Sequence, residues 1–188
     1  MKNKFIAAFI VMLISLVNSF AQTQSQASQA QTAKESSNAE QFSERSGSLI
    51  EKQFIEIGTV RKCHIQVVYF TDLTSNTKQS AVRFENEYVG RYNSDTKVAI
   101  LDADEIDGLI KSIRLLQNKI TAAIPNDYTE IAFKSRSGFS AGCFSDKKNS
   151  SWSSFMKLEK FDSDSYIWMN SDDLPQLLSL LEQAQAKL

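Results

Sequence analysis

The chain has 188 residues, with 21 basic and 22 acidic side chains and one histidine, so its net charge near neutral pH is −1. A chain with this charge has no net electrostatic attraction to phosphate backbones or to anionic lipid surfaces. The composition therefore makes nucleic acid an unlikely partner, and it gives no indication of a surface that binds membranes.

The N-terminal residues have the three-part layout of a secretory signal. Lys2 and Lys4 precede an almost wholly apolar run over residues 5–17, which is shorter than the roughly 20 residues that a membrane-spanning helix needs. Ser19 and Ala21 supply small side chains at the −3 and −1 positions of a cleavage site. We predict a signal peptide over residues 1–21, cleaved after Ala21, and a secreted or periplasmic mature chain with no membrane span. An uncleaved N-terminal anchor is the alternative.

Cleavage would leave 19 basic against 22 acidic residues, a net charge of −3. Residues 22–46 are rich in Gln, Ser and Ala and hold one large apolar residue, Phe42, which is too little to offset the entropy of ordering a chain. We expect a disordered linker there and a single globular domain over residues 47–188.

Two stretches of this domain recur in the same order. FIEIGTVRKCHIQVVYFTD (54–72) aligns without a gap to YTEIAFKSRSGFSAGCFSD (128–146), and VAILDADEIDGLIKSI (98–113) aligns to YIWMNSDDLPQLLSLL (166–181). The offset falls from 74 to 68 residues, so the first copy should carry about six extra residues within 74–95. We interpret the domain as a duplication with copies at about 47–124 and 125–188.

Each copy has the same predicted elements. Alternation and enrichment in β-branched and aromatic residues predict four strands per copy, at 54–60, 64–71, 80–88 and 97–101, then 129–135, 139–145, 153–161 and 166–169. Apolar residues then recur with helical spacing at 106, 109, 110 and 113, and again at 174, 177, 178 and 181. Asp102 with Glu105, and Asn170 with Asp173, fit helix N-caps. The predicted fold class is α+β, with two ββββα repeats that form antiparallel sheets, each closed by an amphipathic helix.

The chain has two cysteines, Cys63 and Cys143, and an oxidising compartment would allow them to form a disulfide. Buried, unbridged thiols are an equally good interpretation, because a disulfide needs Cα atoms within about 7 Å. With one histidine and no metal-ligand spacing, a zinc site is not expected, and neither is any cofactor.

Residues 138–142, GFSAG, match the G-x-S-x-G pattern of serine hydrolases, which would make Ser140 a nucleophile. That pattern requires a helix directly after the serine, whereas a strand continues here, and the only histidine, His64, precedes the serine. Turn or close-packed positions for the two glycines are the simpler interpretation. Cys63 and His64 are adjacent on a strand and so face opposite sides, which leaves Cys143 as the only thiol that His64 could activate.

Aromatic residues are frequent on the predicted strands. At 166–169, Tyr166 and Trp168 alternate with Ile167 and Met169, which would put aromatic and aliphatic side chains on opposite faces of a sheet. Most aromatic residues serve burial, but one sheet face could present stacking groups to a ligand.

Two successive copies of four strands and a helix resemble the architecture of Whirly-type single-stranded DNA-binding proteins. The resemblance rests on the order of elements and on the repeated helix starts, DADEIDGLI and NSDDLPQLL, and it covers most of residues 54–188. It implies binding of single strands by a sheet face. The lysine-glycine strand motif of that family is missing, so no binding residue is carried over.

The expected function is that of an exported, non-enzymatic binding module for an unknown protein or small-molecule ligand, held by a sheet surface or by a groove between the two copies. One alternative is a small hydrolase or thiol enzyme that uses Ser140, Cys143 or His64. The other is single-stranded nucleic-acid binding, by analogy with the Whirly-type fold.

Overall fold

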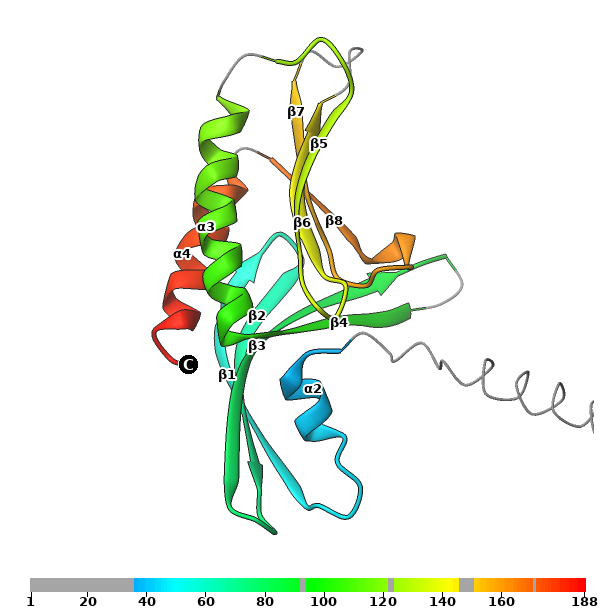
Figure 1. Ribbon diagram of the computed structural model, residues 1–188. Helices are drawn as coiled ribbons and strands as arrows, with labels where there is room; N and C mark the ends of the chain where they lie inside the picture. The colour runs from blue at the N-terminus through cyan, green and yellow to red at the C-terminus, as the bar shows by residue number, and fades with distance from the viewer. Residues whose placement is uncertain (1–35, 92–93, 122–123, 146–150, 171) are drawn as a thin grey trace, which may run out of the picture. The chain divides into compact units, whose positions relative to one another are not determined.

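The computed structural model describes residues 36–91, 94–121, 124–145, 151–170 and 172–188. Within them the chain forms two four-stranded antiparallel sheets, each followed by a long helix (Figure 1). This is the predicted α+β class. The predicted signal at 1–21 and most of the predicted linker, up to residue 35, lie outside the described residues. None of the helices in the described part of the chain has both the length and the apolar character needed to cross a membrane.

The first unit contains strands β1 to β4 in that order across the sheet, followed by helix α3. Its bounds are β1 Ile50–Val60, β2 Cys63–Asp72, β3 Thr77–Val89, β4 Ser94–Asp102 and α3 Ala103–Ile120. The second unit repeats this order with β5 Thr129–Lys134, β6 Ser140–Ser145, β7 Trp152–Lys157, a short 3-10 turn η1 Ser163–Ser165, β8 Tyr166–Met169 and α4 Asp173–Gln185.

All eight predicted strands and both predicted helices are present, and they differ from prediction mainly in length. The strand expected over 153–161 ends at Lys157, because the Asp162 amide donates to the carbonyl of Glu159 in a turn that leads into η1. The first sheet has longer strands: β3 has 13 residues where its counterpart β7 has 6. The predicted extra residues of the first copy fall in this region.

One hydrophobic core contains side chains from both units. The helical stripe of α3 is buried through Ile106, Leu109 and Ile113, and that of α4 through Leu174, Leu177 and Leu181, all with no exposed surface. The two helices begin differently. The Asp102 amide donates to the Glu105 side chain, which confirms the predicted cap of α3. The Asn170 amide donates to the Asp173 side chain, but the predicted cap of α4 is wrong in position, because the N-cap residue is Asp172 and α4 begins only at Asp173.

Polar contacts also join the two units. The Lys97 ammonium lies 2.5 Å from the carboxylate of Asp162, and Arg61 lies 2.5 Å from that of Asp173. At the end of the chain, the Tyr69 hydroxyl donates to the carbonyl of Lys187 at 2.5 Å. Several side chains of the first unit are therefore fixed to the second unit by charged or polar contacts as well as by the core.

A short helix, α2 (Asn38–Ser43), precedes the first sheet and was not expected from the sequence. Its Phe42 and Ala39 are buried in a second, smaller cluster with Val68, Phe70 and Ala81 of the first sheet. Figure 1 shows α2 on the other side of this sheet from α4. The prediction that residues 22–46 form a disordered linker is therefore wrong for 38–43. A single large apolar residue suffices here because the sheet supplies the rest of the burial.

Candidate functional site

The second sheet has an outer face that is turned away from α3 and α4 (Figure 1). A cluster of aromatic side chains in mutual contact lies on this face. Ile167 and Met169 are each 5% exposed and point into the core, whereas Trp168 is 58% exposed. The alternation predicted for 166–169 is confirmed. We call this surface the aromatic face; its aromatic residues are Tyr128, Phe144, Phe155, Tyr166 and Trp168.

The rings of the aromatic face contact one another in an ordered way. Tyr166 and Trp168 are stacked, with centroids 5.1 Å apart and planes 4° from parallel. Phe144 meets Trp168 edge-on at 6.0 Å, and Phe155 meets Tyr166 edge-on at 5.6 Å. Such pairs hold their rings in fixed orientations, and each contributes about 0.5–1.5 kcal/mol beyond burial. Trp168 is thus both held in place and accessible, which suits a residue that contacts a ligand.

A hollow of about 490 Å³ lies between the two units at the free edge of β8. The first unit contributes Arg61 and Lys62 from the β1–β2 turn and the last residues of β3, including Tyr88. The second unit contributes Tyr166 and Trp168 among others. We call it the inter-unit hollow. Its volume falls within the roughly 300–1,000 Å³ typical of small-molecule sites.

Asn86 gives this hollow a polar group that lacks a partner. The side chain is 5% exposed, lines the inter-unit hollow, and its Oδ1 atom has no hydrogen-bond partner within the described part of the chain. A buried acceptor left unpaired costs roughly 1–3 kcal/mol, and such atoms are uncommon in folded proteins.

A second hollow of about 220 Å³ opens on the aromatic face beside the first. Its charged lining consists of Lys134, Lys157, Lys160 and a single acid, Glu130. We call it the lysine hollow. Phe155, Tyr166 and the hydroxyl residues Ser135 and Ser140 complete most of its lining. Tyr166 lines both hollows, so they adjoin one another at this ring.

Ser140 lies at the start of β6 with no helix after it, so the strand-to-helix turn of a hydrolase nucleophile is missing. The two glycines have structural explanations. Gly138 has a φ of +93° in the β5–β6 turn. A Cβ atom on Gly142 would lie 2.3 Å from the carbonyl oxygen of Ile131, so only glycine fits there. The requirements of the β5–β6 hairpin therefore explain the G-x-S-x-G pattern at residues 138–142.

Cys63 and Cys143 are both free, buried thiols within the main core. Burial raises the pKa of Cys63 to about 12 and that of Cys143 to about 11, so both thiols are protonated at neutral pH and are poor nucleophiles. His64 is exposed and lies 3.4 Å from the Thr59 hydroxyl and 3.7 Å from the Glu56 carboxylate. Ser140, His64 and Cys143 are therefore not brought together as a catalytic group.

The acidic residues at the start of α3 have structural partners. Asp102 is 4% exposed and lies 2.6 Å from Arg136, which also pairs with Asp104 at 2.8 Å. Hydrogen bonds to Asp104 and Asp102 raise the pKa of Arg136, and the same contact lowers the pKa of Asp104. In the described ranges, no three histidine, cysteine or acidic side chains are arranged to hold a metal ion.

The sequence pointed to Tyr166 and Trp168 but missed Asn86, Tyr88 and the lysine hollow. Asn86 and Tyr88 come from the other unit, and no local pattern relates them to β8. The lysines could have been noticed in part, because Lys157 and Lys160 flank the end of β7 and Lys134 ends β5. The net charge of the whole chain conceals this local group.

No protein-family model, curated protein or solved structure matches the chain.

Proposed function

We propose that this protein is an exported, non-enzymatic binding module whose ligand occupies the inter-unit hollow and contacts Trp168. The observation that carries the proposal is an accessible, fixed indole in the lining of a hollow of about 490 Å³, to which the other unit contributes Tyr88 and Asn86. Aromatic and polar side chains in the lining of a concavity of this size are typical of ligand sites.

The lining indicates the kind of ligand. Tyr88, Tyr166 and Trp168 favour a flat or apolar group, and the Asn86 amide favours a polar group on it that can form hydrogen bonds. The charged lining of two basic residues, Arg61 and Lys62, and two acidic residues, Glu87 and Asp164, is balanced. A small molecule or a short peptide segment with a ring and a donor group fits these features.

A thermal-shift screen of envelope components tests the proposal, since a ligand of the native state raises the unfolding temperature by mass action. A ligand at 100 times its Kd adds about 2.7 kcal/mol of stability. Trp168→Ala should abolish the shift, while Phe161→Ala serves as the matched control because Phe161 is 93% exposed and does not line the inter-unit hollow. A shift of equal size in Trp168→Ala would contradict the proposal.

A second candidate is binding of single-stranded nucleic acid on the aromatic face. The specific observation in its favour is that lysines adjoin stacked rings there, as in surfaces that bind single strands. The acidic net charge and the predicted export oppose it. This candidate predicts affinity for oligonucleotides that falls steeply with salt, and absence of binding at low salt would exclude it.

A further inference from the structure

We propose that the lysine hollow is an anion-binding site, which takes a carboxylate or phosphate group attached to a ring. The inference goes beyond the proposed function and rests on different residues, because it does not require the inter-unit hollow to be occupied. It begins from the local charge: three lysines against one acid give the lining a charge of +2 on a chain whose net charge is −1.

Lys157 is held in position. Its ammonium donates to the carbonyl of Lys160 at 2.8 Å and lies 4.9 Å from the centroid of the Tyr166 ring. The cation–π contact and the hydrogen bond fix the group at the wall of the lysine hollow. An ammonium has three N–H donors, and the bond to Lys160 uses one of them. An anion in the lysine hollow would accept a hydrogen bond from one of the remaining N–H groups.

Lys160 is positioned by the hairpin opposite it. A Cβ atom on Gly138 would lie 2.7 Å from the Cβ of Lys160, so the absence of a side chain at 138 lets the Lys160 stem pack against the β5–β6 turn. Gly138 is the first glycine of the pattern that resembled a hydrolase motif. In this interpretation the turn serves to bring Lys160 into the lining of the hollow that Ser140 also lines, and not to expose a nucleophile.

The only acid of the lining has another partner. The carboxylate of Glu130 accepts a hydrogen bond from the Tyr128 hydroxyl at 3.0 Å. Ser135 and Ser140 add hydroxyl donors, and Phe155 and Tyr166 add an aromatic surface. Charged, hydroxyl and aromatic groups in one hollow match a ligand that carries an anionic group on a ring.

The volume of the lysine hollow indicates whether it can hold a complete ligand or only one group of a larger ligand. At about 220 Å³ it is smaller than the roughly 300–1,000 Å³ of complete ligand sites. It therefore suits a single acidic ring, such as an acidic sugar unit. Because Tyr166 also lines the inter-unit hollow, a longer ligand with an acidic unit at one end could reach both.

Titration of the full mature chain with D-glucuronate, with D-glucose as the neutral counterpart and inorganic phosphate as a second anion, tests the inference by amide NMR. We expect glucuronate and phosphate to shift the amides of Ser140, Lys157 and Lys160 in a saturable way, and glucose to leave them unchanged. Lys157→Gln should weaken glucuronate binding about tenfold, since it removes a charged hydrogen-bond donor.

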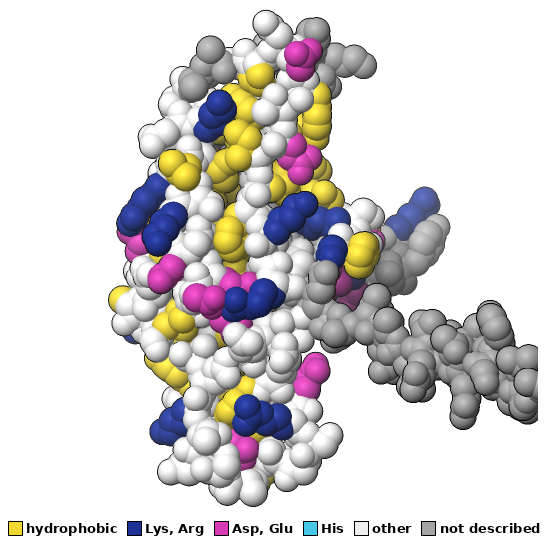
Figure 2. Space-filling view, in the orientation of Figure 1, with side chains coloured by type: hydrophobic (Ala, Val, Ile, Leu, Met, Phe, Trp, Pro, Cys, Tyr) yellow, Lys and Arg dark blue, Asp and Glu magenta, His cyan; other side chains and the backbone are white. Residues whose placement is uncertain are grey.

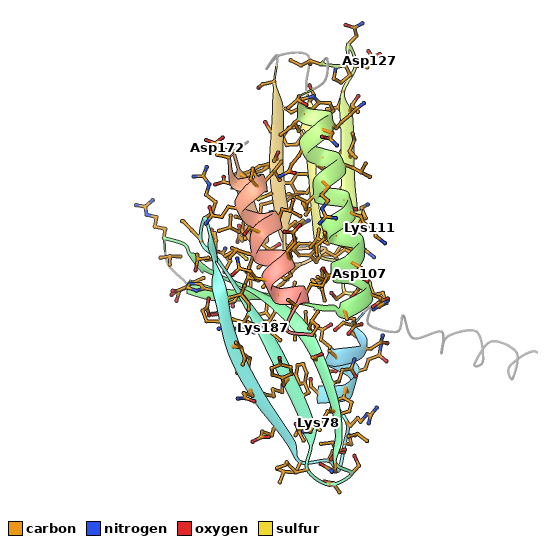
Figure 3. All side chains as sticks on the ribbon, turned by 90° about the vertical axis from the view of Figure 1, so that its left-hand side faces the viewer. Lys78, Asp107, Lys111, Asp127, Asp172 and Lys187 are labelled. Carbon is orange, nitrogen blue, oxygen red and sulfur yellow. The ribbon has the colours of Figure 1, made fainter. Side chains whose placement is uncertain are left out.

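Lys78→Gln is the matched control, because Lys78 is exposed at the far end of the first sheet from the second unit (Figure 3). It should leave the affinity for glucuronate unchanged. Equal shifts with glucose and glucuronate, or equal loss of affinity in Lys78→Gln and Lys157→Gln, would overturn the inference. Tyr88→Ala separates the two proposals, because Tyr88 lines the inter-unit hollow and not the lysine hollow. It should reduce the thermal shift of an inter-unit ligand and leave glucuronate binding at the lysine hollow intact.

Discussion

Arg136 and Asp102, which are 34 residues apart, form an ion pair with 2.6 Å between a guanidinium nitrogen and a carboxylate oxygen. The same buried carboxylate accepts hydrogen bonds from the amides of Asn38 and Ala39, at 2.8 and 3.0 Å. Asp102 therefore joins the N-terminus of α2, the start of α3 and the β5–β6 turn. A carboxylate at the N-terminus of a helix is also favoured by the helix dipole.

Replacement of Asp102 by Ala should lower the free energy of unfolding by about 2–4 kcal/mol, because it leaves the buried Ala39 amide and the part-buried Asn38 amide without acceptors. Asp104→Ala is the control. Asp104 also pairs with Arg136 but its side chain is 68% exposed, so its loss should cost less than about 1 kcal/mol. Urea unfolding measures both, and an equal cost for the two variants would show that Asp102 does not have this joining role.

The contact of Lys97 with the second unit predicts a dependence of stability on pH. Hydrogen bonds to Asp162 and Asp95 raise the pKa of Lys97, and the bond to Lys97 lowers the pKa of Asp162 and of Asp95. A lowered carboxyl pKa stabilises the fold above about pH 4, and this contribution is lost as the pH falls. A raised lysine pKa stabilises below about pH 10, and this contribution is lost as the pH rises.

Wild type and Lys97→Gln should therefore differ most in stability between about pH 4 and pH 10, and the difference should shrink toward pH 3. Unfolding in urea at pH 3 and pH 7 measures this. A difference that is constant with pH would mean that Lys97 acts through packing alone.

The two cysteines should be unreactive in the native protein. Burial raises the pKa of both thiols, so stability should fall as the pH rises above about 8.5, where the unfolded thiols ionise and the buried ones do not. At pH 8, labelling by a thiol reagent should be slow and should accelerate to completion in denaturant. Rapid labelling of either cysteine without denaturant would contradict the buried positions.

Gly142→Ala should destabilise the second sheet by about 2 kcal/mol or more, because the added Cβ would meet the backbone of β5 at 2.3 Å and the strands would have to separate. Gly108→Ala is a useful contrast. There the added Cβ meets only the ring of Phe133 at 3.2 Å, and alanine favours the helix by roughly 0.5–1 kcal/mol. The unfolding temperature of Gly142→Ala should lie well below that of Gly108→Ala. The reverse order would contradict the close packing of β5 and β6.

Most of the fold was predictable because its signals are local. Alternation along β8 and the spacing of Leu174, Leu177 and Leu181 on α4 are each set by which face of an element is buried. The helix α2 was missed because its stability comes from residues far along the chain, including Asp102. A local sign of it existed: Ser37 followed by Glu40 is a capping box, and both of its hydrogen bonds are formed.

The candidate site was predictable only in part. Alternation placed Tyr166 and Trp168 on one face, but it could not show that the end of β3 lines the same hollow as β8, which is a consequence of how the two units pack. The space-filling view shows hydrophobic side chains at the surface over the upper part of the molecule, where α3 and the second sheet lie (Figure 2). Whether a hydrophobic side chain stays at the surface depends on which elements pack over it in the tertiary structure. The spacing of residues in the sequence does not contain this information.

The most direct test of the central proposal, that a ligand occupies the inter-unit hollow against Trp168, is the fluorescence of that indole in a Trp152→Phe variant, which leaves Trp168 as the only tryptophan. A ligand that raises the unfolding temperature should also shift the emission to shorter wavelength and protect the indole from acrylamide quenching. Unchanged emission and quenching at saturating ligand would contradict the proposal, because Trp168 would then remain in contact with water.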